Sequence, residues 1–144
     1  MSGKTVAVGA DHAGFELKAI LADELGRAGY GVLDLGTSGP GSVDYPDYAA
    51  AVVGAMRDGR AGWGVLVCGS GIGMSIAANR HPGIRAALCQ TPELARLARQ
   101  HNDANVLVLG ARMIDPDTAR ACLAAFLATA FEAGRHTRRV AKLA

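Results

Sequence analysis

Five short apolar runs, separated by segments of helical periodicity, limit what this chain of 144 residues can fold into. Each run is continuous rather than alternating apolar with polar residues, which is typical of strands buried on both faces of a parallel sheet. The segments between them repeat apolar residues at helical spacing. The expected strands are 5–9, 31–36, 63–67, 84–89 and 105–110, and the expected helices are 15–28, 46–56, one from the glycine turn near 71 to about 79, 91–103, 115–131 and 135–143.

This alternation predicts an α/β fold in which helices cover both faces of a parallel sheet. The length suits one domain over residues 1–144, and no repeat, low-complexity tract or linker interrupts it. In such folds ligands bind beyond the carboxyl ends of the strands. Asp11 and His12 follow the first strand and Cys68 follows the third, so the two sites share one crevice if these strands are neighbours.

Composition argues against several functions. The net charge of +2 is too small to indicate nucleic-acid binding over the whole surface. No apolar run approaches the roughly 20 residues of a membrane span, and residues 1–4 lead towards a strand without the apolar core of a signal peptide. Three widely spaced cysteines, with no CxxC pair, indicate neither a disulfide framework nor a zinc site, and favour a reducing cytoplasm.

Residues 65–75 read as a buried strand, a tight glycine turn and a helix start. The strand ends on Cys68, and Gly69, Gly71 and Gly73 follow at every second position. Such a turn presents several backbone N–H groups at one point, where they can hold an anion. A thiol beside a helix N-terminus has a lowered pKa and can act as a base or nucleophile. The alternatives are a plain core cysteine and glycines that only allow close packing. For Cys89 and Cys122 we expect the core role.

Nucleotide binding is a weaker interpretation of the glycines. The turn has the pattern GxGxG rather than GxGxxG, and it follows the third strand rather than the first. The turn over 9–14 has the spacing of a P-loop but lacks the Lys-Ser/Thr pair that follows one.

We expect His101 at the opposite end of the sheet from Cys68. It ends a helix and precedes the fifth strand, and a five-residue strand spans roughly 17 Å. His101 therefore either caps its helix or serves the site of a second chain, which predicts a dimer with shared sites. Further along, Arg135 and Arg139 are four residues apart on one helical face, which suits a grip on phosphate. The alternative for this pair is a solvated basic face.

Several spaced motifs together resemble the ribose-5-phosphate isomerase B family, which includes galactose-6-phosphate and allose-6-phosphate isomerases. The resemblance runs in order over almost the whole chain. The motifs are the segments 9–15 (GADHAGF), 44–46 (DYP), 68–73 (CGSGIG), 77–79 (AAN), 99–105 (RQHNDAN) and 134–136 (GRH), with Arg139.

The resemblance implies a Rossmann-like three-layer α/β/α sandwich with a five-stranded parallel sheet of order 2-1-3-5-4. It implies an aldose–ketose isomerase of the non-oxidative pentose phosphate pathway, with no metal or organic cofactor. It also implies a homodimer, sometimes paired into tetramers, whose active sites lie between subunits. The expected partner is a small phosphosugar, with no role for nucleic acid or a membrane.

By position, the resemblance implies that Cys68 is the base that moves a proton between C1 and C2. Ser70, at a place often held by threonine, shuttles protons between the sugar oxygens, and His101 opens the furanose ring. Some relatives use a glutamate one turn into the helix instead, where this chain has Met74 and Ser75. The resemblance also implies that Asp11 orients the sugar hydroxyls, that Asn102 assists ring opening and that Tyr45 lines the pocket. The N–H groups that would stabilise the enediolate are those of Gly69, Gly71, Ile72, Gly73 and Met74. The side chains that would hold the phosphate are those of His12, Arg112, Arg135 and Arg139.

The first expectation is reversible conversion of ribose 5-phosphate to ribulose 5-phosphate through an enediolate. Another four- or six-carbon aldose phosphate is the alternative within the same class, since no residue excludes it. A phosphosugar- or nucleotide-binding module without catalysis is the alternative of another class. Such a module lacks a reason to keep Cys68, Ser70 and His101 together.

Overall fold

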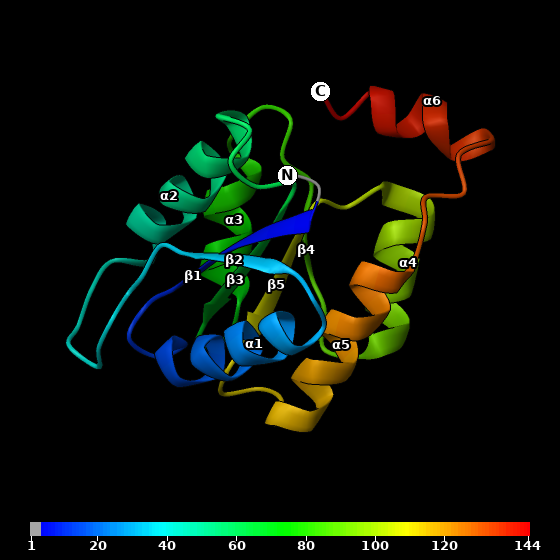
Figure 1. The fold of residues 1–144 in the computed structure, drawn as a ribbon. Coiled ribbons are helices and arrows are strands. Elements are labelled where there is room, and N and C mark those ends of the chain that lie inside the picture. The colour runs from blue at the N-terminus through cyan, green and yellow to red at the C-terminus, as the bar shows by residue number, and fades with distance from the viewer. Residues whose placement is uncertain (1–3) are drawn as a thin grey trace.

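The computed structural model describes residues 4–144, in which strands and helices alternate along the chain (Figure 1). The prediction that the first residues lack the apolar core of a signal peptide concerns residues 1–3 in part, and these lie outside the described residues. No helix in the described part of the chain has the length and apolar character needed to cross a membrane. The elements are β1 (Thr5–Ala10), α1 (Phe15–Arg27), β2 (Gly31–Asp34), α2 (Tyr45–Arg57), β3 (Trp63–Cys68), α3 (Ile72–Asn79), β4 (Ala86–Leu88), α4 (Pro92–Asn102), β5 (Val106–Gly110), α5 (Pro116–Ala128) and α6 (Arg135–Ala141).

All five strands of the sheet run parallel, in the order β2-β1-β3-β5-β4. This order confirms the one that the family resemblance implied. The chain moves outward from β1 to β2 and then crosses back to β3, so β1 and β3 are neighbours. Their carboxyl ends point to the same edge, which brings the turns after Ala10 and Cys68 together as predicted.

Two hydrophobic layers, one on each face, hold the sheet between its helices. Side chains alternate along each strand, so Val65 and Val67 pack with α1, α4 and α5, whereas Leu66 and Cys68 pack with α2 and α3. Phe126 of α5 is completely buried in the first layer. The thiol of Cys68 therefore lies on the side of the sheet that carries α3. Figure 1 shows the same three-layer arrangement.

Two of the described helices, α4 and α5, begin at a residue whose side chain caps them. The Thr91 hydroxyl accepts a hydrogen bond from the Leu94 N–H at 3.2 Å, which caps α4. Asp115 caps α5 in the same way, accepting from the Thr118 N–H at 2.7 Å. Most predicted bounds agree with the structure within two residues.

The end of α5 is where the prediction is wrong by more than that. The expected helix ran to Phe131, but α5 ends at Ala128 and Thr129 is extended. Tertiary hydrogen bonds hold the following segment along α4. The Arg99 Nε donates to the Thr129 carbonyl at 3.1 Å, and the Glu132 N–H donates to the Gln100 carbonyl at 3.0 Å. The final basic helix is confirmed, and α6 lies against the end of α4, away from the sheet (Figure 1).

Candidate active site

Backbone hydrogen bonds join the turns after β1, β3 and β5 at one edge of the sheet. The Asp11 N–H donates to the Val67 carbonyl at 3.2 Å, and the Ala111 N–H donates to the Cys68 carbonyl at 2.8 Å. The Arg112 N–H donates to the Gly69 carbonyl at 2.9 Å. Residues from three strands therefore surround the buried Cys68.

The turn between β3 and α3 leaves backbone donors pointing out of the helix start. Gly71 precedes the helix with φ of 82°, a left-handed conformation that favours glycine. The Ser70 Oγ accepts from the Ile72 N–H at 3.2 Å, and the first helical bond is donated by the Ser75 N–H. The N–H groups of Gly73 and Met74 have no acceptor within the helix, so they are available to an anion.

Two side chains lie close over this turn, at places where only glycine leaves room. A Cβ added at Gly69 would lie 3.0 Å from the Arg112 Nη1, so the guanidinium covers Gly69. A Cβ added at Gly73 would lie 2.6 Å from the Tyr45 Cζ, so the phenol ring covers the start of α3. Tyr45 and Arg112 are both exposed to solvent. The glycines thus admit a cation and an aromatic ring beside the thiol's turn.

Asp11 and His12 hold the neighbouring loop in place. The buried Asp11 accepts from the N–H groups of Ala13 and Gly14 through Oδ1, at 3.0 and 3.1 Å. The His12 Nδ1 accepts from the Val43 N–H at 3.2 Å, which leaves Nε2 as the protonated nitrogen of the neutral ring. These hydrogen bonds occupy the Oδ1 of Asp11 and the Nδ1 of His12. The Oδ2 of Asp11 and the Nε2 of His12 are the atoms available to a ligand.

The other half of the predicted site lies at the opposite end of the sheet. Gly64 pairs with Val106 at one end of the β3–β5 ladder, and Cys68 pairs with Gly110 at the other. At about 3.3 Å per residue, these ends are roughly 13 Å apart. His101 and Asn102 end α4, just before β5 begins, so they and the adjoining α6 are separated from Cys68 by the length of the sheet.

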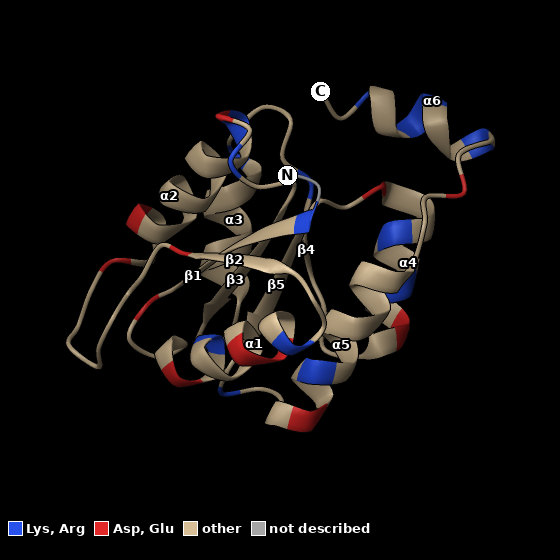
Figure 2. Ribbon diagram, viewed as in Figure 1, with Lys and Arg blue, Asp and Glu red and all other residues tan. Residues whose placement is uncertain are grey.

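Basic side chains gather at that far end. Figure 2 shows Lys and Arg on α6, and its sequence over 135–141 contains no Asp or Glu. Arg135 and Arg139 are exposed, as is Arg112 at the near end. Within residues 4–144, none of these three guanidinium groups forms an ion pair with a carboxylate. They are therefore free to meet a dianionic group.

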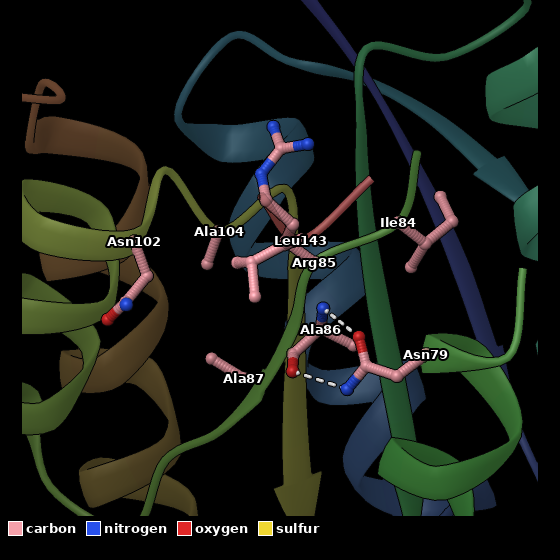
Figure 3. Close-up of a pocket in the computed structure, with 8 residues that line it drawn as sticks. All are labelled: Asn79, Ile84, Arg85, Ala86, Ala87, Asn102, Ala104 and Leu143. Atoms are coloured by element: carbon pink, nitrogen blue, oxygen red, sulfur yellow. Dashed lines mark hydrogen bonds between the residues drawn. The ribbon is translucent and has the colours of Figure 1, made fainter. Parts of the chain in front are cut away.

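A pocket of about 420 Å³ lies at the far end rather than over Cys68. Figure 3 shows it between the ends of α3 and α4, where the Asn79 side chain is hydrogen-bonded to both backbone groups of Ala86. Among the predicted site residues, Asn102 is the one that lines it. The predicted site is thus two separate surfaces on one chain. One holds Asp11, His12, Tyr45, Arg112 and the segment 68–74, and the other holds His101, Asn102, Arg135 and Arg139.

The two remaining cysteines occupy the core, as predicted. Burial, followed by the nearby Cys122, raises the pKa of the Cys89 thiol to about 12. Burial also raises the pKa of Cys122. Neither thiol is available as a thiolate near neutral pH, which leaves Cys68 as the candidate base.

Sequence reasoning missed two residues that contact His101. The rings of His101 and His136 stack with centroids 4.5 Å apart and planes at 15°. The Glu132 Oε1 lies 4.0 Å from the His101 Nε2 and 3.8 Å from the His136 Nε2. The four-residue spacing of Glu132 and His136 was the available signal. The predicted continuation of α5 to Phe131 concealed it.

Comparison with known proteins shows similarity over almost the whole chain. A family model described as Ribose/Galactose Isomerase matches residues 6–143. The chain is 44% identical over 137 residues to ribose-5-phosphate isomerase B of Escherichia coli, covering 95% of this chain and 92% of that one. It is 41% identical over 140 residues to the D-erythrulose-4-phosphate isomerase of Pectobacterium atrosepticum, covering 96% and 92%.

A solved structure extends the likeness to the fold. The ribose 5-phosphate isomerase from Thermotoga maritima is 51% identical and superposes with a TM-score of 0.95. The match covers 96% of each chain. Similarity of this extent shows that the two chains share the fold.

Proposed function

The chain belongs to the ribose/galactose isomerase family, and on that premise we propose that it interconverts D-ribose 5-phosphate and D-ribulose 5-phosphate. The observation that supports this most is the buried Cys68 at a strand tip, beside the free N–H groups of α3 and the guanidinium of Arg112. An aldose–ketose isomerase of sugar phosphates needs a base and an anion cradle at the reacting carbons, and a cation within reach of the phosphate.

At this centre the thiolate of Cys68 removes the proton from C2 of the open aldose. The electron pair forms the C1–C2 double bond, and the carbonyl oxygen O1 becomes the enediolate anion. The N–H groups of Gly73 and Met74 stabilise that charge where it develops. Cys68 returns its proton to C1, while Ser70 transfers the hydroxyl proton from O2 to O1. Atoms and charge balance without a metal or an organic cofactor.

The partner subunit supplies the rest of the site in this proposal. His101 and Asn102 of the partner subunit assist opening of the furanose ring. Arg135 and Arg139 of the partner subunit grip the phosphate opposite His12 and Arg112 of the first chain. Two observations support the division: His101 lies a sheet length from the thiol of its own chain, and the arginines form no ion pair with a carboxylate of residues 4–144. A cytoplasmic location, which keeps Cys68 reduced, is part of the same proposal.

Substrate identity is tested by a coupled assay across aldose phosphates of four, five and six carbons. We expect the highest kcat/KM with ribose 5-phosphate. The relative that acts on D-erythrulose 4-phosphate makes a four-carbon sugar the second candidate. Turnover of a four- or six-carbon sugar together with none of ribose 5-phosphate would replace the first candidate.

The base assignment is tested with Cys68→Ala, using Cys89→Ala as a matched control from the core. Loss of a general base costs about 10²–10⁴-fold in kcat, so Cys68→Ala should lose isomerase activity by this factor. It should still bind ribitol 5-phosphate, which has no carbonyl, and Cys89→Ala should keep its activity. Full activity in Cys68→Ala would remove the base assignment. No turnover of any aldose phosphate by the wild type would favour a binding module instead.

A further inference from the structure

The stacked pair of His101 and His136 joins a helix end to the C-terminal helix. His101 ends α4 with its side chain 41% exposed, whereas the side chain of His136 in α6 is only 12% exposed. The ring of His136 is thus held by its surroundings, and it presents a flat face to the more accessible ring of His101. Stacking of this kind restricts rotation of the exposed ring.

Glu132 faces both rings from the segment that links α5 to α6. Its Oε1 lies within ion-pair distance of both Nε2 atoms, at 4.0 Å and 3.8 Å. Its backbone N–H donates to the Gln100 carbonyl at 3.0 Å, next to His101 in the chain. This bond anchors the backbone of Glu132 beside the end of α4, with its carboxylate near both rings.

The surroundings of His136 disfavour its protonated form. Burial lowers the pKa of His136, followed by the charges of His101, Arg135 and Arg139, while Glu132 opposes them. His136 is therefore held neutral and serves as a surface. His101 is the more exposed of the two rings, and its Nε2 faces the Glu132 carboxylate.

A proton suits these three groups better than a metal ion does. A metal ion must lie near the plane of each imidazole that binds it, at about 2.0–2.1 Å from the nitrogen. Two rings with planes at 15° and centroids 4.5 Å apart cannot both point to one such position without unstacking.

We propose that His136 and Glu132 are positioning residues that hold His101 in the orientation in which it opens the sugar ring. The inference rests on the proposed function, because it takes ring opening by His101 as its starting point. Neither residue touches the sugar in this assignment. His136 fixes the plane of the His101 ring, and Glu132 stabilises the imidazolium that forms during proton transfer.

The chemistry of the two substrates separates this role from the isomerisation step. Ribose 5-phosphate is a closed furanose, because its O4 attacks C1. Ribulose 5-phosphate stays open, because the hydroxyl that would attack its C2 carbonyl carries the phosphate. Its conversion needs Cys68 and the anion cradle, and the aldehyde produced can close its ring in solution. Loss of ring-opening assistance therefore slows consumption of ribose 5-phosphate selectively.

The variants are His136→Ala, which removes the stacked ring, His136→Phe, which keeps a flat ring, and Glu132→Gln, which removes the charge. His81→Ala and Glu93→Gln are matched controls outside the cluster. We measure kcat at saturation in both directions, so that weaker phosphate binding appears in KM instead. His136→Ala and Glu132→Gln should lower kcat for ribose 5-phosphate about tenfold and kcat for ribulose 5-phosphate less than about twofold. His136→Phe should recover most of the loss seen in His136→Ala.

Three results would overturn the proposal. Equal losses in both directions would show a general structural role. Unchanged kcat for ribose 5-phosphate in His136→Ala and Glu132→Gln would show no role. No rescue by His136→Phe would remove the stacking argument. Failure of the proposed function is distinguishable from these, because the wild type itself would then not turn over ribose 5-phosphate.

Discussion

At the scale of single residues, the site depends on where side chains are missing as much as on where they are present. Gly14 starts α1 so close to β3 that an added Cβ would lie 2.4 Å from the Val67 carbonyl oxygen. Gly69 and Gly73 likewise leave room for Arg112 and Tyr45. The glycine pattern and Cys68 could be read from the sequence. The His101–His136 stack could not be predicted, because it depends on how the segment after α5 packs along α4 and not on local sequence spacing.

Gly14→Ala tests the close approach of α1 to β3. The new methyl group meets backbone rather than a flexible side chain, so unfolding free energy should fall by about 1–3 kcal/mol or more. Gly26→Ala is the matched control in the same helix, where an added Cβ meets nothing within 4 Å. There alanine should raise stability by about 0.5–1 kcal/mol. Chemical denaturation measures both, and a neutral Gly14→Ala would contradict the packing argument.

At the scale of elements, caps and apolar periodicity predicted the helices wherever local interactions decide their ends. Thr91 and Asp115 are examples, since each satisfies a free N–H of its own helix. The end of α5 is determined by tertiary contacts instead. Arg99 is buried against the rings of Trp63 and Phe126, and its Nε holds the Thr129 carbonyl. No local pattern reveals such a partner 30 residues away.

The cap of α5 gives the protein a pH-dependent element. Hydrogen bonds from the N–H and then the hydroxyl of Thr118 lower the pKa of Asp115 below its usual value of 3.8. The charged carboxylate thus stabilises the fold above the unfolded pKa, and this contribution is lost as pH falls through the folded pKa. Asp115→Asn keeps the acceptor oxygen but not the charge.

Denaturation of wild type and Asp115→Asn between about pH 6 and about pH 3 measures this contribution. Wild type should be the more stable at the upper end, and the difference should shrink as pH falls. A difference that grows towards acid would contradict the direction of the shift.

At the scale of the whole molecule, the predicted site residues form two groups at opposite ends of one sheet. Parallel strands could be predicted from their continuous apolar runs, because both faces are buried. The strand order came from family resemblance, since periodicity does not say which strands are neighbours. A twofold dimer would place each half beside the complementary half of its partner and so form two complete sites.

Mixing two inactive variants tests this arrangement. In a mixed dimer of Cys68→Ala and His101→Ala chains, one site carries both defects and the other is intact. Random mixing should therefore restore about a quarter of wild-type activity. The measurement is activity after joint refolding, with mixed dimers verified by mass spectrometry. Activity that stays at the level of the separate variants would show that each site lies within one chain.

The distance between His101 and Cys68 then has a consequence for how the protein behaves in a cell. Under the shared-site proposal, a newly made monomer is inactive, because its own His101 and Cys68 cannot act on one sugar. Dimerisation would make it active. Turnover per chain would become a function of abundance, low when copies are scarce and constant once nearly all are paired. Because the sheet keeps the two groups of residues apart, activity per chain would rise only once expression exceeds the level at which dimers form.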